Sequence, residues 1–350
     1  MLRVAIIGAG SIAKRHIAAI QANPDAEIAC ICDMNEERVA SIAKEFGLTN
    51  YCTDYMDILK DETVDAVSIL TPTFTHKTIV LEALNHGKHV LCEKPPALNV
   101  QEAIECAEAA AKSGKLLMHA FVRRFGKVVR FLKEYIDSGA MGEIYYADVA
   151  RMERCNKLAG WFVNKDRAGG GKLMDACIHQ LDTALYLMDF PKVKSVKGYT
   201  TYVNAHLPGV MKGSKSAWVS ADKGTYERTV ESMACGQVHF ENGACLNVKA
   251  SDILNVVDEG SYVELCGTKA GFKETGAEIR MVTVDDSGYY LKSSPVLTAE
   301  DNAFNNEVNH FVDCCVNGTE CICKPEHSVE VMRIISALYE SAETGKEIVF

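Results

Sequence analysis

The sequence of 350 residues lacks any apolar run near the ~20 residues that a membrane-spanning helix needs. It also lacks positive charge, because 37 Lys and Arg stand against 47 Asp and Glu, a formal net charge of −10. No basic run is longer than Arg123-Arg124. This balance argues against nucleic acid or an anionic membrane as a partner. The apolar start is too short for a signal peptide and enters a glycine turn, so we expect a cytoplasmic protein.

Disulfide and metal signatures are also missing, although the chain has 14 cysteines. The chain is long and shows no secretion signal, so a disulfide framework is not expected. The one suggestive cluster, Cys314, Cys315, Cys321 and Cys323, has no paired C-x-x-C spacing. We therefore expect these thiols to serve packing in a reducing compartment, and we predict no metal site.

The first 120 residues alternate short apolar runs with segments of helical periodicity, which predicts a Rossmann-type doubly wound parallel sheet. Strands are expected at Leu2–Ile7, Glu27–Cys32, Ala66–Leu70, His89–Cys92 and Leu116–Phe121. Helices are expected at Ser11–Ala22, Asn35–Phe46, His76–His86 and Val100–Lys112. We place this first domain at residues 1–122.

The remainder, residues 123–350, has the pattern of an α+β domain with a large, mostly antiparallel sheet. Strands are expected at Glu143–Met152, Val193–Val203, Val230–Phe240, Ala244–Ser251, Tyr262–Cys266 and Glu278–Val284. Helices are expected at Lys127–Ser138, Lys172–Met188, Asp301–Val316 and Glu326–Ala342. The polar segment Asn204–Arg228 is a long loop, either a lid or contact or a variable surface excursion.

A glycine motif, Gly8-x-Gly10-x-x-Ala13, follows the first strand and opens a helix. The first glycine permits a tight turn, the second permits close approach of a pyrophosphate, and Ala13 allows close packing of helix and strand. The amides of Ser11 and Ile12 at the helix start would face the phosphates. In this context the motif predicts a nicotinamide dinucleotide site.

Asp33 ends the second strand, where an acid hydrogen-bonds the adenosine ribose of NAD. Its carboxylate would repel the extra phosphate of NADP, so we predict NAD. Two alternatives stay open: Asp33 could cap the following helix, and Arg38 could accommodate that phosphate.

Two later loops should line the same crevice, because they also follow strands of the parallel sheet. One carries Thr71-Pro72 and leads to His76, and the other carries Glu93-Lys94-Pro95. We assign Thr71, Pro72, His76, Glu93 and Lys94 to the cofactor site.

Glu93-Lys94-Pro95 together with the glycine motif resembles the Gfo/Idh/MocA family, the glucose–fructose oxidoreductase and inositol dehydrogenase group. Further matches follow in order: Arg123-Arg124-Phe125, the segment from Gly169 to Asp182, Val230-Glu231, Phe240-x-Asn242-Gly243 and Gly267-Thr268-Lys269. The resemblance covers essentially the whole chain. It implies hydride exchange between NAD(P) and a hydroxyl or carbonyl of a sugar, sugar derivative or cyclitol, and a homodimer or homotetramer formed through the C-terminal sheet.

The resemblance also assigns catalysis to Lys94, Asp175 and His179. Asp175, His179 and Asp182 are spaced to share one face of a helix. His179 would take the hydroxyl proton, Lys94 would stabilise the developing alkoxide, and Asp175 would orient the substrate or His179. The alternatives without a catalytic role are that Asp175 caps the helix and that His179 is a core histidine.

Substrate contacts are predicted for Lys94, Arg124, Trp161, Asp175 and His179, with Lys165 and Asp166 nearby. Trp161 could stack on a sugar or pack in the core. Two departures from the family pattern, Cys177 and Gly126-Lys127, affect the expected pocket.

Three functions are consistent with these residues. The leading one is an NAD-dependent sugar, glycoside or cyclitol dehydrogenase. The second is an enzyme that keeps NAD bound and recycles it while acting on glycosides or epimerising sugars. The third is a non-catalytic dinucleotide-binding regulator, which the intact set of Lys94, Asp175 and His179 disfavours.

Overall fold

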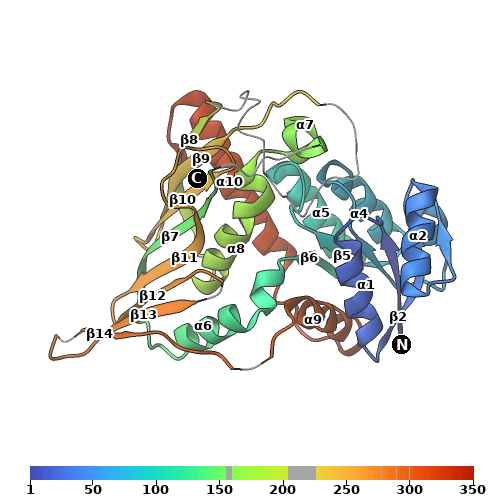
Figure 1. Cartoon of the computed structure of the whole chain (residues 1–350), viewed down its shortest axis with the longest axis horizontal. Helices are drawn as coiled ribbons and strands as arrows, with labels where there is room; N and C mark the ends of the chain where they lie inside the picture. Colours follow the sequence, from blue (N-terminus) through green and yellow to red (C-terminus); the bar gives the residue numbers. More distant parts are fainter. Residues whose placement is uncertain (155–159, 204–225, 277, 289, 299) are drawn as a thin grey trace. The chain divides into compact units, whose positions relative to one another are not determined.

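The computed structural model describes residues 1–154, 160–203, 226–276, 278–288, 290–298 and 300–350. They form two compact units (Figure 1). The first comprises Met1–Phe125 and Asn302–Met332, and the second comprises Gly126–Asp301 and Arg333–Phe350. The chain thus leaves the first unit after Phe125 and returns to it at Asn302. Residues 204–225 of the predicted long loop lie outside the described residues.

A parallel sheet forms the core of the first unit, in the strand order β3-β2-β1-β4-β5-β6. The strands are β1 Leu2–Ile7, β2 Ala26–Cys32, β3 Tyr51–Cys52, β4 Ala66–Ile69, β5 His89–Glu93 and β6 Leu117–Ala120. The order reverses between β1 and β4, which is where a doubly wound sheet binds its ligand. The predicted Rossmann sheet is confirmed; the two-residue strand β3 was not predicted.

Helices flank this sheet, and short polar side chains begin several of them. They are α1 Ala13–Ala22, α2 Glu36–Phe46, α3 Tyr55–Lys60, α4 His76–Asn85, α5 Val100–Ser113 and α9 Ala303–Asn317, with 3₁₀ turns at Thr73–Thr75 and Val122–Phe125. Asn35 and Asn99 cap α2 and α5 by accepting backbone N–H bonds. Helix α9 lies beside α1 (Figure 1), and the Asn23 amide donates to Asn309 at 2.7 Å.

A mixed sheet forms the core of the second unit, in the order β14-β13-β12-β11-β7-β10-β9-β8-β15 among the described residues. Its strands are β7 Ile144–Met152, β8 Val193–Thr201, β9 Met233–Phe240, β10 Cys245–Ser251, β11 Gly260–Gly267, β12 Ala270–Glu274, β13 Ile279–Val284, β14 Tyr290–Ser293 and β15 Ile348–Val349. Only β7 and β10 pair in parallel; the other pairings are antiparallel. The prediction of a large, mostly antiparallel sheet is confirmed.

One face of this sheet is apolar and covered by helices, as Figure 1 shows for α8 and α10. Val196, Val238, Leu246 and Leu265 on that face are fully buried. The helices of the second unit are α6 Lys127–Asp137, α7 Lys165–Ala168, α8 Ile178–Leu187 and the later part of α10 Pro325–Thr344. No helix in the described part of the chain is long and apolar enough to cross a membrane.

Candidate active site

The turn after β1 requires glycine at its first motif position. Gly8 has a φ of +109°, and a Cβ there would lie 2.8 Å from the carbonyl carbon and oxygen of Leu70. A side chain would therefore be strained and would clash with the loop after β4. A Cβ on Gly10 would meet nothing within 4 Å, so open space lies over the second glycine. The turn supplies the bare backbone that a pyrophosphate needs.

The start of α1 is left open to an anion. Its N-cap residue Ile12 offers no side-chain hydrogen bond, and the first turn contains no acid. Helix α2, in contrast, is capped by Asn35 and begins with Glu36 and Glu37. An uncapped helix N-terminus retains amides and a partial positive charge for phosphate. The residues present thus fit a dinucleotide.

Asp33 lies at the end of β2 and faces the glycine turn. Its carboxylate accepts from the Ala9 N–H at 2.9 Å and from the Asn35 N–H at 2.9 Å. The guanidinium of Arg38 lies 3.2 Å from Asp33 Oδ2. Helix α2 is capped by Asn35, whose side chain accepts from the Arg38 N–H. Asp33 is therefore not the helix cap, and Arg38 is an ion-pair partner of Asp33.

His76 joins the two other candidate cofactor loops. Its Nδ1 lies 2.8 Å from the Pro95 carbonyl oxygen, and its Nε2 lies 2.8 Å from the Thr71 carbonyl oxygen. Burial lowers the pKa of the ring, an effect that the two carbonyls oppose. Because only 1% of His76 is exposed, the ring can position Thr71-Pro72 and the loop after β5, but offers no surface for contact with a cofactor.

A buried relay supports the loop that carries Lys94. Ser68 Oγ lies 3.2 Å from His16 Nδ1, and His16 Nε2 lies 3.1 Å from Glu93 Oε1. The Lys94 N–H donates to Glu93 Oε2 at 3.0 Å. Burial raises the pKa of Glu93, but the His16 hydrogen bond and the Lys94 charge outweigh burial and lower it. Lys94, itself half-buried, thus follows a carboxylate fixed from two sides.

In the second unit, Asp175 and His179 lie on a helix that begins irregularly. Leu173–Cys177 forms a π turn, and α8 continues from Ile178. Asp175 and His179 are half-buried, whereas Asp182 is 0% exposed. Asp175 and His179 thus keep some exposed surface. Asp182 has no exposed surface. The three side chains of Asp175, His179 and Asp182 therefore do not share the one accessible helix face that the spacing predicted.

The glycine run before this helix is explained by close packing. A Cβ on Gly170 would lie 2.1 Å from the Tyr339 hydroxyl, and one on Gly171 would lie 2.7 Å from Glu231. The Gly171 N–H donates to Glu231 at 2.9 Å, and the Tyr339 hydroxyl donates to it at 3.0 Å. Burial raises the pKa of Glu231. This packing fixes where the segment carrying Asp175 begins.

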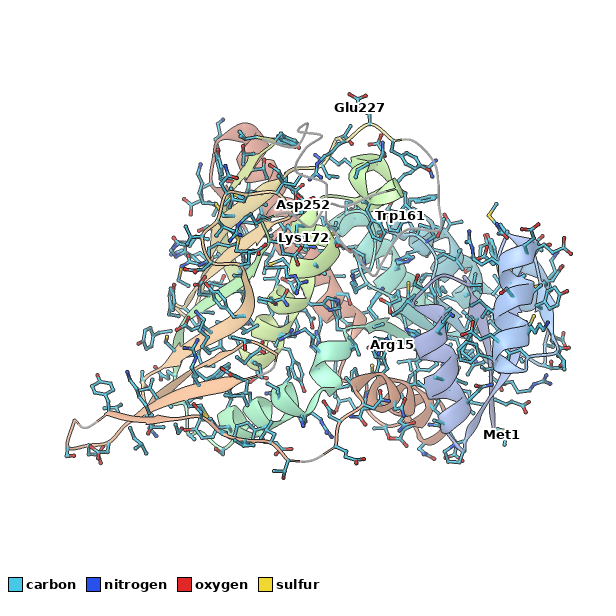
Figure 2. The ribbon with its side chains drawn as sticks, in the orientation of Figure 1. Met1, Arg15, Trp161, Lys172, Glu227 and Asp252 are labelled. Atoms are coloured by element: carbon cyan, nitrogen blue, oxygen red, sulfur yellow. The ribbon has the colours of Figure 1, made fainter. Side chains whose placement is uncertain are left out.

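An ion pair that the sequence analysis did not single out lies beside this segment. Lys172, labelled in Figure 2, is 4% exposed and lies 2.7 Å from the carboxylate of Glu153, which follows β7. Arg151 also reaches that carboxylate, at 2.6 Å. Only the folded structure reveals this ion pair, because Lys172 and Glu153 are not neighbours in the sequence.

Three other predicted residues have packing roles. Arg124 is 0% exposed and donates to the Ile322 carbonyl at 2.6 Å. Trp161 is 9% exposed and stacks on Phe162 with ring centroids 3.8 Å apart. Cys177 is 0% exposed, and burial raises the pKa of its thiol to about 12, which is typical of a packing cysteine. The Arg124 and Trp161 side chains are both mostly buried in this structure, and the substrate contacts predicted for them stay predictions.

Lys165 and Asp166 lie in the short helix α7. The Lys165 ammonium lies 2.7 Å from Glu343, while Asp166 occupies the first turn of that helix. At the Gly126-Lys127 departure, Gly126 begins α6 and the Lys127 N–H donates to Asp301 at 2.8 Å.

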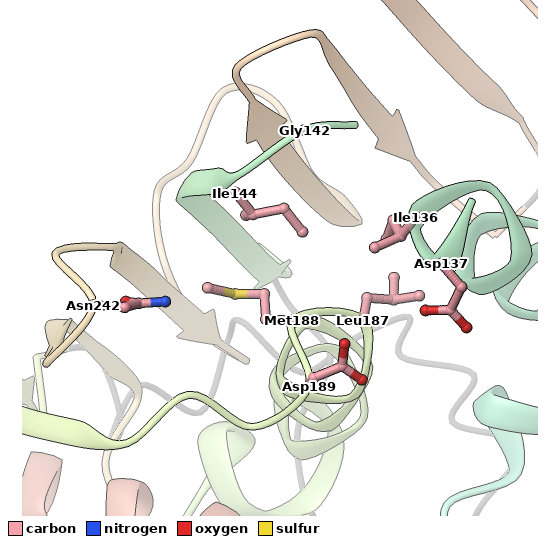
Figure 3. Close-up of a pocket in the computed structure, with 8 residues that line it drawn as sticks. All are labelled: Ile136, Asp137, Gly142, Ile144, Leu187, Met188, Asp189 and Asn242. Carbon is pink, nitrogen blue, oxygen red and sulfur yellow. The ribbon is translucent and has the colours of Figure 1, made fainter. Parts of the chain in front are cut away.

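The second unit also has a hollow of about 410 Å³ (Figure 3). Asp137, Asp189 and Asn242 line it together with apolar side chains, and Lys133 lies 2.7 Å from Asp189. None of the predicted catalytic residues lines this hollow, so it is not the candidate site.

Comparison with known families accounts for this arrangement. Residues 2–121 match the model of the oxidoreductase family with an NAD-binding Rossmann fold, and residues 133–350 match the model of its C-terminal α/β domain. The chain belongs to the Gfo/Idh/MocA family of oxidoreductases. It is thus an oxidoreductase with a nicotinamide-binding first unit, as the glycine turn and the open helix start indicate.

Named relatives span the whole chain. The D-glucoside 3-dehydrogenase of Escherichia coli K12 is 34% identical over 356 aligned residues, covering 99% of this chain and 97% of that protein. The scyllo-inositol 2-dehydrogenase (NAD(+)) of Bacillus subtilis 168 is 26% identical and covers 91% of this chain and 87% of that protein. A levoglucosan dehydrogenase solved with NADH and levoglucosan has the same fold, with a TM-score of 0.83 at 23% identity over 99% of both chains.

Proposed function

We propose that this protein is an NAD-dependent dehydrogenase that exchanges hydride with a ring hydroxyl or carbonyl of a sugar, glycoside or cyclitol. The observation that carries the proposal is the intact set of Lys94, Asp175 and His179 in a chain similar over its full length to a D-glucoside 3-dehydrogenase. A regulator without turnover would have no use for this set. A glycoside with a free ring hydroxyl is the substrate class that this similarity favours, and a cyclitol is the second.

The preference for NAD rests on Asp33. Its carboxylate is held at the end of β2 by two backbone N–H groups, where it can accept from ribose hydroxyls and repel a 2′-phosphate. Arg38 is paired with that carboxylate. Arg38, which could otherwise bind the 2′-phosphate of NADP, therefore already forms an ion pair.

The three proposed catalytic groups would have separate roles: proton transfer, stabilisation of negative charge and orientation. When bound, the nicotinamide supplies hydride chemistry at the carbinol carbon. His179 removes the hydroxyl proton in oxidation and returns it in reduction. Lys94 places its ammonium beside the oxygen as negative charge develops there, and Asp175 orients the substrate or the His179 ring.

Two further parts of the proposal concern the setting. We propose a homodimer or homotetramer formed through the open face of the second unit's sheet. We also propose a reducing compartment, the cytoplasm, because the cysteines that the structure describes are all free thiols.

A substrate screen tests the function. Purified protein is incubated with glycosides, free sugars and cyclitols, each with NAD and with NADP, while the absorbance of reduced nicotinamide is followed. We expect NAD reduction with at least one glycoside or cyclitol. Mass analysis of cofactor released by denaturation covers the second candidate, because bound NAD without net reduction would favour internal recycling. If no substrate reduces either cofactor and none is bound, the dehydrogenase proposal fails.

A further inference from the structure

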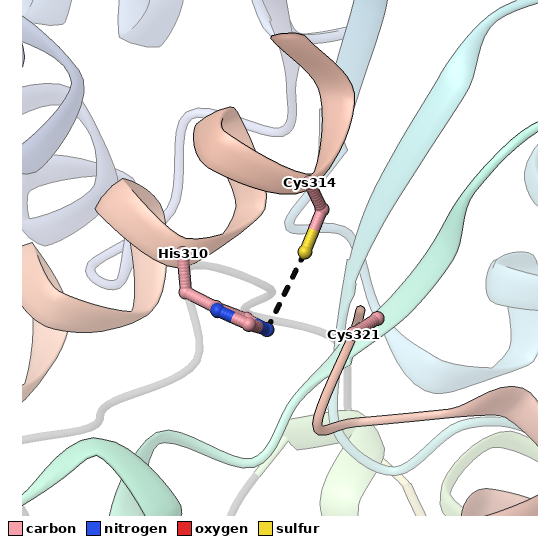
Figure 4. A group of neighbouring side chains, drawn as sticks. All are labelled: His310, Cys314 and Cys321. Atoms are coloured by element: carbon pink, nitrogen blue, oxygen red, sulfur yellow. Dashed lines mark hydrogen bonds between the residues drawn. The ribbon is translucent and has the colours of Figure 1, made fainter. Parts of the chain in front are cut away.

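A group of thiol and imidazole side chains lies at the end of α9 in the first unit. His310 and Cys314 are one helical turn apart, and Cys314 Sγ lies 3.4 Å from His310 Nε2 (Figure 4). The helix ends at Gly318, whose φ is +73°, and the chain then turns back. This reversal brings in Cys321, so that the three ligand atoms all lie within 4.8 Å of one another.

We propose that this His310–Cys314–Cys321 cluster binds one zinc ion. Bond lengths of about 2.3 Å to sulfur and about 2.0 Å to nitrogen place ligand atoms roughly 3.5–3.8 Å apart around a tetrahedral zinc. The distance from Cys314 Sγ to His310 Nε2, 3.4 Å, is already close to this value, and the other two separations lie within 4.8 Å. Two thiolates with one imidazole are donors suited to zinc, and water completes the tetrahedron.

The imidazole nitrogen nearest Cys314 Sγ is the one that carries the lone pair. His310 Nε2 lies 3.1 Å from the Ile322 amide N–H, which can only donate, so Nε2 acts as an acceptor. Zinc takes the place of that contact. Binding also requires the two thiols to become thiolates, so two protons pass to solvent for each ion bound.

The zinc would cross-link a segment on which the first unit depends. The segment from Cys314 to Cys321 joins α9 to the turn before α10, and the next residue, Ile322, accepts the Arg124 guanidinium bond at 2.6 Å. An ion held by both sides of the turn would fix this connection. We assign the ion to holding this turn, separate from the proposed hydride chemistry.

Metal analysis of the full-length protein tests the proposal. The protein is produced in zinc-supplemented medium, purified under reducing conditions with a tag that binds no metal, and dialysed against a weak chelator. We expect about one zinc per chain by elemental mass spectrometry. A strong chelator should remove the zinc and lower Tm. Zinc-free protein, or a Cys314–Cys321 disulfide in place of two thiols by intact mass, would overturn the proposal.

Variants assign the ligands. C314S, C321S and H310Q should each lose most of the zinc, whereas the neighbouring C315S, which leaves the cluster intact, should keep it. If a ligand variant does not fold, Co²⁺ titration of the metal-free wild-type protein decides, because thiolate ligation gives an intense charge-transfer band. Full zinc retention in C314S and C321S, or the absence of that band, would contradict the site.

Discussion

Lys94 and His179 are the residues on which the proposed chemistry depends. Removing either side chain should leave most of the cofactor affinity, because the glycine turn and Asp33 lie elsewhere, although Lys94 is also assigned to the cofactor site. We expect Lys94→Ala and His179→Ala each to lower kcat by about 100-fold or more. Steady-state kinetics and cofactor titration by fluorescence measure the two effects. Lys112→Ala and His86→Ala, at exposed positions of the first unit, serve as controls; retained turnover in a catalytic variant would end its assigned role.

Asp33 should decide between the two nicotinamide cofactors. Replacing it with Ser removes the negative charge that would repel a 2′-phosphate and frees Arg38 from its ion pair. We expect the ratio of kcat/KM for NADP over NAD to rise by about tenfold or more, equivalent to about 1.4 kcal/mol. Glu36→Gln removes a nearby acid in the first turn of α2 and should leave the ratio unchanged. An equal shift in both variants would show a general charge effect.

Glu307 on α9 is a buried acid with a stability cost. It is 0% exposed, and neither carboxylate oxygen has a hydrogen-bond partner among the residues that the structure describes. Burial raises the pKa of this carboxyl well above its usual range, and the charge of Glu93 acts in the same direction. The folded protein therefore favours the neutral form of Glu307 more than the unfolded chain does.

The sign of the pH effect follows from that raised pKa. The contribution of Glu307 to stability is fully present below its unfolded pKa and is lost as pH rises toward its folded pKa. Glu307→Gln, which cannot ionise, should gain stability relative to wild type between about pH 5 and 8, on the order of 1 kcal/mol. Urea denaturation at several pH values measures this. A difference that is constant with pH would contradict it.

At the scale of elements, the segment leading into α8 depends on its glycines. Gly171→Ala would drive a methyl group to 2.7 Å from Glu231, beside the bond that fixes the start of the π turn. We expect destabilisation on the order of 1–3 kcal/mol and a loss of kcat, because Asp175 and His179 would shift. Gly260→Ala, which meets nothing within 4 Å, is the matched control. Equal Tm values for the two variants would refute the packing argument.

The same segment shows the limit of periodicity. The spacing of Asp175, His179 and Asp182 predicted a shared helical face, and Lys172–Met188 was predicted as one helix. The structure inserts a π turn at Leu173–Cys177 and buries Asp182. Sequence spacing assumes regular geometry, whereas the close contacts of Gly170 and Gly171 fix where this segment starts.

At the scale of the whole molecule, one face of the sheet in the second unit is not covered by helices. That face carries polar side chains. Lys249, Asp148 and Tyr262 form a hydrogen-bonded group there, and Gln237 and His239 are exposed. If this face joins copies of the chain, Gln237→Arg should lower the mass measured by light scattering after gel filtration. Gln21→Arg, at an exposed position of α1 in the first unit, should leave that mass unchanged. A monomeric wild type would refute the interface.

Much of the fold was predictable. Strands β1, β2, β4, β5 and β6 are near-continuous apolar runs, because both of their faces are covered, and the runs fall where predicted. The return of α9 to the first unit was not predictable. The apolar face of α9 must pack against another element, but the sequence does not show which one. Only the folded structure shows that it packs against α1.

The sequence by itself determined the Rossmann fold and the glycine turn that suits a dinucleotide, and it named the residues to which we assign catalysis, because these depend on local backbone geometry and on residue type. Only the tertiary structure decided that Arg124 is buried, that His76 joins two loops, and that His310 lies close to Cys314 and Cys321. Burial and meetings between distant segments follow from how the chain returns on itself, and no local pattern encodes that path.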